Sequence, residues 1–187
     1  MADDENITDE NITLRRAEKR DKDRVAVLWT AFLEEQAEHD ARFEVADDAR
    51  ERFDNDFPVW IDDGTQRTVV AERAGEEGEA ELIGFATAHR WGPPPIYAEA
   101  SEVFVDEFYV APEARRQGVG RRLAEALGDW ADELDADRLR LRVLHDNEAG
   151  RAFWQSVGGA PFAVTMTVER EREERAEERP EQRRIGF

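Results

Sequence analysis

The stretch that decides the fold runs from Asp106 to Gly120 and reads DEFYVAPEARRQGVG. Its apolar beginning predicts the end of a strand, and an amphipathic helix is expected to follow over 115–134. Glycines let backbone N–H groups approach an anion closely, and the start of a helix adds the positive end of its dipole. The stretch therefore predicts a phosphate-binding turn between a strand and a helix, with paired carboxylates just upstream.

The periodicity of apolar residues predicts the other elements around this turn. Strands are expected over 12–15, 68–71, 81–88, 101–110, 138–144 and 162–168, and the remaining helices over 22–38, 47–61 and 147–157. The turn Gly75–Gly78 indicates an antiparallel hairpin, and the strand–helix–strand unit from Glu102 to Leu144 a parallel crossover. The fold class is therefore α/β, with a mixed, mostly antiparallel sheet, one parallel crossover and helices on both faces.

Length and charge limit the remaining choices. The 187 residues suit one domain, expected over 11–168, with a disordered N-terminus over 1–10 and a charged tail over 169–187. The acidic start and the lack of an apolar run near ~20 residues predict a cytoplasmic protein that does not enter membranes. There is no cysteine, and the three histidines are scattered, so no metal site is expected.

The charge balance is unusual, with 45 acidic against 26 basic residues and a net charge of −19. Lys19 and Lys22 are the only lysines. Molar salt shortens the Debye length to ~3 Å and screens repulsion between surface carboxylates. The composition resembles that of proteins from extreme halophiles, and it disfavours nucleic acid as a partner because the field would repel phosphates.

Two motifs, in order and on the expected kinds of element, carry a family resemblance. The first is Arg115-Arg116-Gln117-Gly118-Val119-Gly120 after a strand, and the second is the helix from Asn147 that carries Phe153-Trp154 and ends at Gly158-Gly159. Over about residues 12–168 the chain resembles the GNAT superfamily of N-acetyltransferases. A glycine-rich hexamer by itself would be weak evidence, whereas the pair of motifs is much stronger.

The resemblance implies the acyl-CoA N-acyltransferase fold and acetyl-CoA as co-substrate, without a metal. The pyrophosphate is expected on backbone N–H groups at the helix start, with arginines adding charge. Pantetheine would pair with the splayed strand as a neighbouring strand does, and an N–H there would stabilise the developing oxyanion. The residues implied in cofactor binding are Phe108, Tyr109, Val110, Arg115, Arg116, Gln117, Gly118, Val119, Gly120, Arg121, Asn147 and Trp154.

Acetyl transfer to an amine needs a base, because an alkylammonium has a pKa near ~10.4. The run Asp106-Glu107-Phe108-Tyr109-Val110 resembles the strand of polyamine and thialysine acetyltransferases, in which paired carboxylates hold and deprotonate a cationic amine. Adjacent strand residues point to opposite faces unless a β-bulge turns both inward. We assign Glu107 and Asp106 as catalytic residues, with the order between them open and Glu102 as a further candidate base.

Trp154 stands where the family usually has a tyrosine that protonates the departing thiolate. An indole N–H is no useful acid, so either water assists or Tyr109, Tyr97 or Ser156 contributes. Gly159-Ala160 also departs from the usual Gly-Phe. The region beyond it offers only one clear strand, so a shortened final hairpin is expected.

The sequence thus predicts an N-acetyltransferase that works by direct transfer in a ternary complex. Its acceptor would be a primary amine, either a small cationic metabolite or a protein lysine or N-terminus, and a homodimer is one assembly to consider. The alternative is a non-catalytic acyl-CoA-binding or regulatory module, which the missing tyrosine favours.

Overall fold

The structure is a computed structural model, and it describes residues 11–75, 80–92 and 101–168. Several expectations concern residues outside these ranges. They are the disordered N-terminus, most of the turn Gly75–Gly78, the candidate acid Tyr97 and the charged tail.

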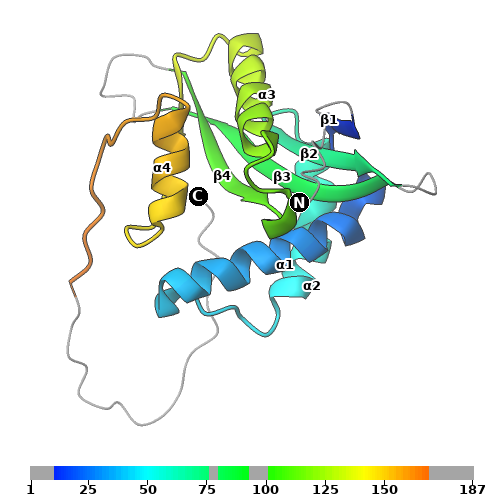
Figure 1. Ribbon diagram of the computed structural model, residues 1–187, viewed down its shortest axis with the longest axis horizontal. Coiled ribbons are helices and arrows are strands. Elements are labelled where there is room, and N and C mark those ends of the chain that lie inside the picture. The colour runs from blue at the N-terminus through cyan, green and yellow to red at the C-terminus, as the bar shows by residue number, and fades with distance from the viewer. Residues whose placement is uncertain (1–10, 76–79, 93–100, 169–187) are drawn as a thin grey trace, which may run out of the picture.

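A single twisted sheet forms the centre of the protein (Figure 1). Its strands are β1 (Ile12–Arg16), β2 (Gln66–Ala74), β3 (Ala80–Trp91), β4 (Glu102–Val110) and β5 (Arg138–Leu141). They lie in the order β1-β2-β3-β4-β5, antiparallel from β1 to β4, whereas β4 and β5 are parallel. The mixed sheet with one parallel crossover is confirmed.

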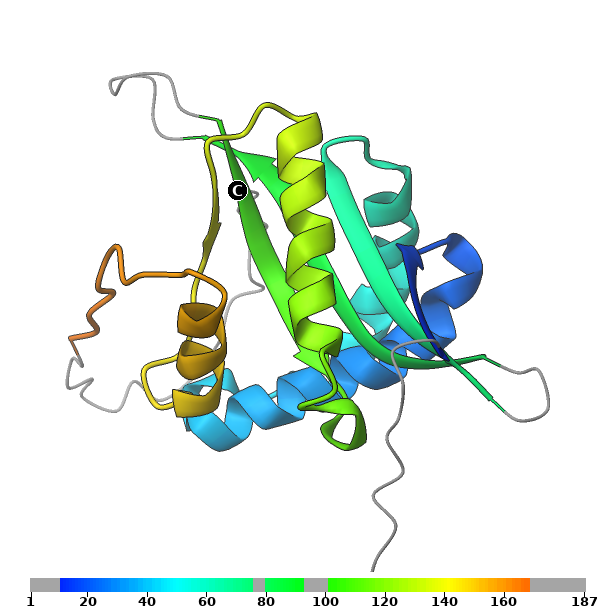
Figure 2. The same ribbon diagram turned by 45° about the horizontal axis from the view of Figure 1, so that its top comes forward.

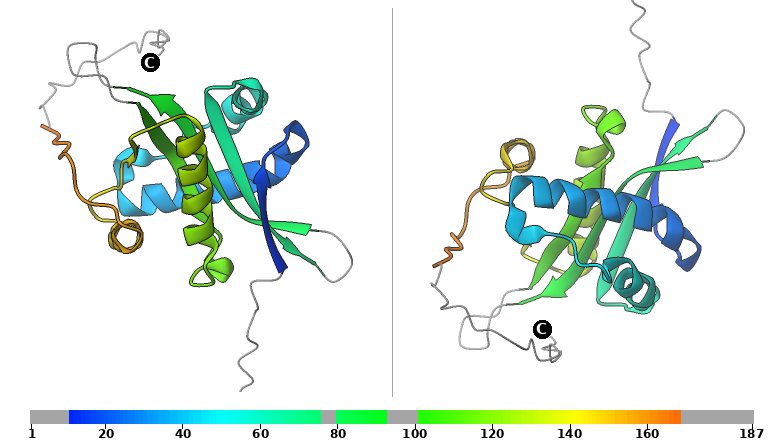
Figure 3. Two further views of the ribbon diagram at one scale, coloured as in Figure 1. Left: turned by 90° about the horizontal axis from the view of Figure 1, so that it is seen from above. Right: turned by 90° about the horizontal axis from the view of Figure 1, so that it is seen from below.

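Helices cover both faces of this sheet. α1 (Lys22–His39) and α2 (Ala49–Asp62) lie on one face and α3 (Val119–Glu133) on the other, as the opposite views of Figure 3 show. α4 (Glu148–Ser156) follows β5, and the short 3₁₀ turns are η2 (Lys19–Asp21), η3 (Ala41–Phe43) and η4 (Pro112–Ala114). The α1 face and the α3 face are the names used below for the two sides of the sheet.

Each face has its own apolar core, which follows from the alternation of side chains along the strands. The α3 face buries Ile83, Val103, Leu123 and Leu127, and the α1 face buries Val25, Phe53, Phe57, Val70 and Phe85. Burial of each such side chain contributes roughly 1.5–3 kcal/mol, so these clusters fix both helix layers on the sheet.

The last predicted strand is wrong: residues 162–168 have no regular secondary structure. The alternating side chains of Phe162, Val164, Met166 and Val168 are 72%, 86%, 84% and 86% exposed. A strand needs a partner for its backbone, and within the described ranges no strand of the sheet pairs with this segment. β5 is also shorter than predicted, ending at Leu141 rather than Leu144.

Figure 2 shows β5 leaving the side of β4 as the chain runs on to α4. In the part of the chain that the structure describes, no helix is both long and apolar enough to cross a bilayer.

Candidate active site

The free edge of β4 is the first component of the site. β5 pairs with β4 only from Glu102 to Val105, so in the described chain the rest of β4 has no strand on that side. Ala111 N donates to Ile83 O at 2.9 Å, which marks a hydrogen-bonded pair. Bonded pairs alternate along antiparallel strands, so Phe108 and Val110 direct their N–H and C=O groups toward the free edge.

A β-bulge turns both carboxylates onto the α1 face. Thr87 lies opposite Glu107 and Ala88 lies opposite Val105, which leaves Asp106 as an extra residue in β4. Glu107 contacts Thr87, and Asp106 contacts His89, two positions further along the same face of β3. The bulge therefore gathers side chains that regular alternation would have separated.

Glu107 is held by donors from two elements. Trp29 Nε1 of α1 donates to Oε1 at 2.7 Å, and Thr87 Oγ1 of β3 donates to Oε2 at 2.9 Å. Burial raises the pKa of Glu107, the two hydrogen bonds oppose that rise, and the charge of Asp106 adds to it. A carboxylate has about four lone-pair positions, so Glu107 can still accept a proton.

Asp106 lies beside Glu107 and is more open to solvent, with 41% of its side chain exposed. Its Oδ2 is 2.7 Å from His89 Nδ1. Burial raises the pKa of Asp106, while His89 and the more distant charge of Arg142 lower it. The pKa values of Asp106 and Glu107 are thus both raised, chiefly by burial, and perturbed pKa values in neighbouring acids cluster at functional sites.

The turn that the sequence predicts to bind phosphate has an unusual backbone. Gly118, with φ of +82°, is the N-cap of α3, and Arg116 also has a positive φ of 65°. Within the described ranges, no protein acceptor bonds the N–H groups of Val119, Gly120 and Arg121. A Cβ on Gly118 would meet nothing within 4 Å, so the space before these N–H groups is open.

The arginines of this turn differ in their contacts. The side chain of Arg115 makes hydrogen bonds within the protein. Its Nε donates to Val110 O at 2.9 Å, and its Nη2 donates to Glu35 at 2.5 Å. Arg116 and Arg121 are exposed at the start of α3. The side chain of Gln117 donates to Glu113 O at 2.8 Å, which closes the turn.

α4 packs its aromatic pair on the α3 face beside the free edge of β4. Phe108 is centred 5.4 Å from Phe153 and 4.9 Å from Trp154. A Cβ on Gly120 would lie 3.1 Å from Phe153, which explains a glycine there. Asn147 caps α4, its Oδ1 accepting from Gly150 N at 2.7 Å.

The other candidates lie in different surroundings. Tyr109 is buried on the α1 face against Phe32 and Phe85, and this burial raises its pKa. Ser156 donates to Phe153 O within α4. Glu102, at the far end of β4, is buried and paired with Arg138 and Arg140. It therefore serves as an ion-pair partner away from the bulge.

Sequence reasoning missed Trp29, Thr87 and His89. Trp29 fits the apolar stripe of a helix, and nothing local distinguishes it from a core residue. Thr87 and His89 stand two apart on a hairpin strand, a spacing that puts polar side chains on one face and was the available signal.

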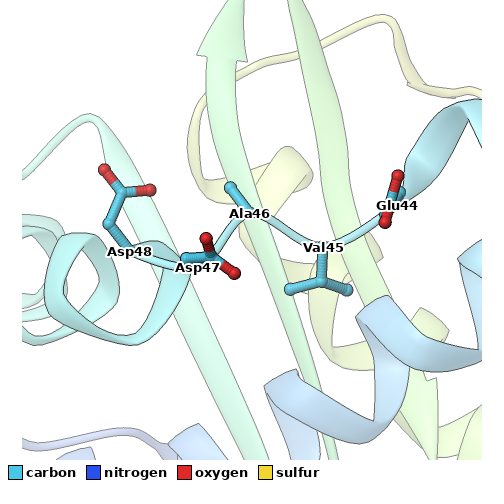
Figure 4. Close-up of a pocket in the computed structure, with 5 residues that line it drawn as sticks. All are labelled: Glu44, Val45, Ala46, Asp47 and Asp48. Atoms are coloured by element: carbon cyan, nitrogen blue, oxygen red, sulfur yellow. The ribbon is translucent and has the colours of Figure 1, made fainter.

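Figure 4 shows a hollow on the loop between η3 and α2, lined by Glu44, Val45, Ala46, Asp47 and Asp48. It is acidic, and Asp48 is already paired with Arg52 of α2. Asp106 and Glu107 are not among the residues that line it, so the hollow is not part of the bulge.

The free edge of β4, the bulge and the glycine turn all lie within a region that matches a family model. Residues 25–159 match the model described as the acetyltransferase (GNAT) family. The chain belongs to this family. The predicted family resemblance is therefore confirmed, and the match covers both sequence motifs.

Curated relatives of this GNAT chain include an N-acetyltransferase of Streptomyces griseus, 37% identical over 87 residues. That match covers 46% of this chain and 43% of the relative. A phosphinothricin N-acetyltransferase of Streptomyces coelicolor is 34% identical over 88 residues, covering 47% of this chain and 48% of the relative. The chain thus spans less than half the length of either.

Solved structures share the fold at low identity. The BH1408 protein of Bacillus halodurans aligns with a TM-score of 0.72 and 20% identity, covering 84% of this chain and 99% of its own. AAC(6')-Iy, in complex with a bisubstrate analogue of CoA and acetylneamine, aligns with a TM-score of 0.67 and 16% identity, covering 86% and 98%. At these identities the likeness concerns the fold.

Proposed function

We propose that this GNAT protein is an acetyl-CoA-dependent N-acetyltransferase acting on a primary amine. The observation that carries the proposal is a partly buried carboxylate, Glu107, placed beside a strand edge that lacks a partner. Strand β4 therefore supplies both the base and the free main-chain groups that can bind the acyl donor.

Acetyl-CoA supplies the activated acetyl group as a thioester. The free N–H groups at the start of α3 suit its pyrophosphate, and exposed Arg116 and Arg121 add positive charge. Phe108 and Val110 direct main-chain groups to the open edge, where an amide-containing chain can pair as a strand does. Arg115 supports this arrangement indirectly, by holding the Val110 carbonyl and Glu35.

Glu107, with Asp106 beside it, receives the proton of the acceptor ammonium. The freed amine nitrogen then forms a bond to the thioester carbonyl carbon, and the C–S bond breaks in a direct transfer. The Phe108 N–H is available to the carbonyl oxygen as negative charge grows on it. A thiolate with a pKa near ~8.5 departs without Trp154 as acid, and water relays to it the second proton, which the nitrogen loses as the amide forms.

The acceptor class stays a primary amine, with a small cationic molecule or a protein amine as the two sources. The bulge supports a cationic amine because two carboxylates face one side of the sheet. The net charge of −19 supports a cytoplasm of high salt as the setting, where it would be screened.

Calorimetry and turnover test the proposal together, in concentrated KCl. The protein is titrated with CoA and acetyl-CoA, and CoA release is followed with a panel of amines. We expect Glu107→Gln to lower turnover while CoA binding is unchanged. Glu125→Gln, an exposed acid of α3, is the matched control. Binding without CoA release for any amine would identify a non-catalytic acyl-CoA-binding module, and no binding at all would refute the whole assignment.

A further inference from the structure

Three arginines follow one face at the β5 side of the sheet. Arg138, Arg140 and Arg142 stand at alternate positions, so they share a face as far as the strand geometry continues. The guanidinium of Arg140 lies 4.8 Å from the Trp91 ring and that of Arg142 lies 5.4 Å from the Phe104 ring. The Phe104 ring in turn is 5.7 Å from that of His89, which bonds Asp106. The row therefore ends beside the bulge.

The first two arginines share one acid. Arg140 Nε lies 2.7 Å from Glu102 Oε2, and Arg138 Nε lies 3.4 Å from Oε1. Glu102 is 2% exposed, and a buried carboxylate needs such partners. Arg138, Arg140 and Glu102 therefore all have an ion-pair partner within the fold.

Arg142 is different. Its side chain is exposed and stacked on Phe104, and no carboxylate in the described ranges lies within ion-pairing distance of it. The chain has 45 acidic residues against 26 basic ones, so acids available for pairing are plentiful. Asp106, which the charge of Arg142 reaches, is bonded to His89 instead. Arg142 thus presents several N–H donors at the edge of the site, and stacking on the Phe104 ring stabilises the position of its guanidinium group.

The phosphates of the acyl donor are not the partner of Arg142. The proposed phosphate turn follows the Val110 end of β4, whereas Phe104 lies six residues back along the strand. At about 3.3 Å per residue these points are about 20 Å apart. An anion at Arg142 is therefore not a phosphate of the acyl donor, and the carboxylates of the bulge assign the acceptor amine to the same neighbourhood.

We propose that Arg142 binds a carboxylate carried by the acceptor, so that the acceptor class is an amino acid or a close derivative. This rests on the proposed function. The ammonium group of the acceptor faces Glu107 and Asp106. The carboxylate of the same molecule forms a bidentate ion pair with the guanidinium of Arg142. An amine without a negative group loses this contact.

The test compares free L-amino acids with their C-terminal amides. The ratio of kcat/KM for acid over amide is measured in the wild type and in Arg142→Gln, so that differences in amine pKa cancel between proteins. We expect the ratio to fall about 10- to 100-fold in Arg142→Gln, the range for a hydrogen bond to a charged group. Arg142→Lys should lie between, because it keeps the charge and loses the fork.

Arg90→Gln is the matched control, because Arg90 is an exposed arginine of β3 next to His89 and so points to the other face. It should leave the ratio unchanged. An equal loss for acids and amides in Arg142→Gln, or a wild-type preference for amides or plain diamines, would overturn the inference while leaving N-acetylation intact.

A second readout needs no turnover. The CoA-loaded wild type is titrated with the same amino acids and amides. The amino acids should bind more tightly than their amides, and this difference in affinity should disappear in Arg142→Gln. Amino acids that do not bind, or that bind Arg142→Gln equally well, would overturn the inference even if the protein were inactive. Failure of CoA itself to bind would instead count against the proposed function.

Discussion

Trp29 Nε1 donates a hydrogen bond of 2.7 Å to Oε1 of Glu107, joining helix α1 to strand β4 across 78 positions of sequence. The same indole packs on Phe53, with ring centroids 4.9 Å apart, so its position is fixed by the core of the α1 face. The apolar core on that face thereby holds the orientation of the carboxylate that we propose as the base.

Removal of the indole donor should shift the pH dependence of catalysis. The hydrogen bond from Trp29 lowers the pKa of Glu107 against the rise caused by burial. Without it the pKa rises further, so in Trp29→Phe the acid limb of the kcat/KM profile should move to higher pH. Thr87→Val should move it in the same direction, since Thr87 also donates to this carboxylate.

The matched control for this shift is Trp60→Phe, which alters a tryptophan of the same aromatic cluster that packs on Phe53 and Phe57. It should leave the acid limb in place. Two results would show that Glu107 is not the group that titrates. The acid limb of the kcat/KM profile would shift equally in Trp60→Phe, or it would not shift in Trp29→Phe.

The two carboxylates of the bulge should differ in how much they contribute. General-base catalysis supplies about 10²–10⁴-fold, so Glu107→Gln should reduce kcat by at least about 100-fold. Asp106→Asn keeps the base and removes a neighbouring charge, so we expect mainly a higher KM for cationic acceptors. Steady-state kinetics on both variants checks this, and the reverse pattern would make Asp106 the base.

Glycines of α3 provide a test of close packing beside the free edge of β4. A Cβ on Gly128 meets nothing within 4 Å, so Gly128→Ala should raise the free energy of unfolding by about 0.5–1 kcal/mol through helix propensity. Gly120→Ala gains the same propensity but brings its Cβ to 3.1 Å from Phe153. Denaturant unfolding should therefore show a smaller gain or a loss for Gly120→Ala, and equal gains would contradict the packing.

The Arg15 cluster should make stability depend on acid. Bonds from the Arg15 guanidinium, at 2.6 Å to Asp21 and 2.8 Å to Glu72, hold the pKa of each acid below its ordinary value. Groups with lowered pKa stabilise the fold above their unfolded pKa, near about 4, and lose this contribution as the pH falls through the folded pKa.

Asp21→Asn should therefore cost about 3 kcal/mol at neutral pH, as expected when one partner of a buried pair is removed, and the difference from the wild type should shrink toward pH 2. Thermal or urea unfolding at several pH values measures it. Asp62→Asn, which breaks an exposed pair with Lys19, should have little effect at any pH. A cost for Asp21→Asn that persists unchanged in acid would rule out the electrostatic explanation.

The local sequence determined the elements and the turn. The apolar alternation of β4, the glycines after Arg116 and the amphipathic stripe of α3 act over a few residues, and the structure shows a strand, a left-handed Gly118 and a helix there. Such features depend on neighbours in the chain, so periodicity and glycine placement are sufficient to predict them. The first family motif lies in the same local stretch.

Only the tertiary structure decided what surrounds the carboxylates. Whether Asp106 and Glu107 face one side depended on a bulge, which arises from the register between β3 and β4. The donors Trp29 and Thr87 come from distant elements, and the 162–168 segment alternates like a strand yet has no regular structure. Register and edge pairing are set by contacts between segments far apart in sequence, and a pattern within one segment carries no record of them.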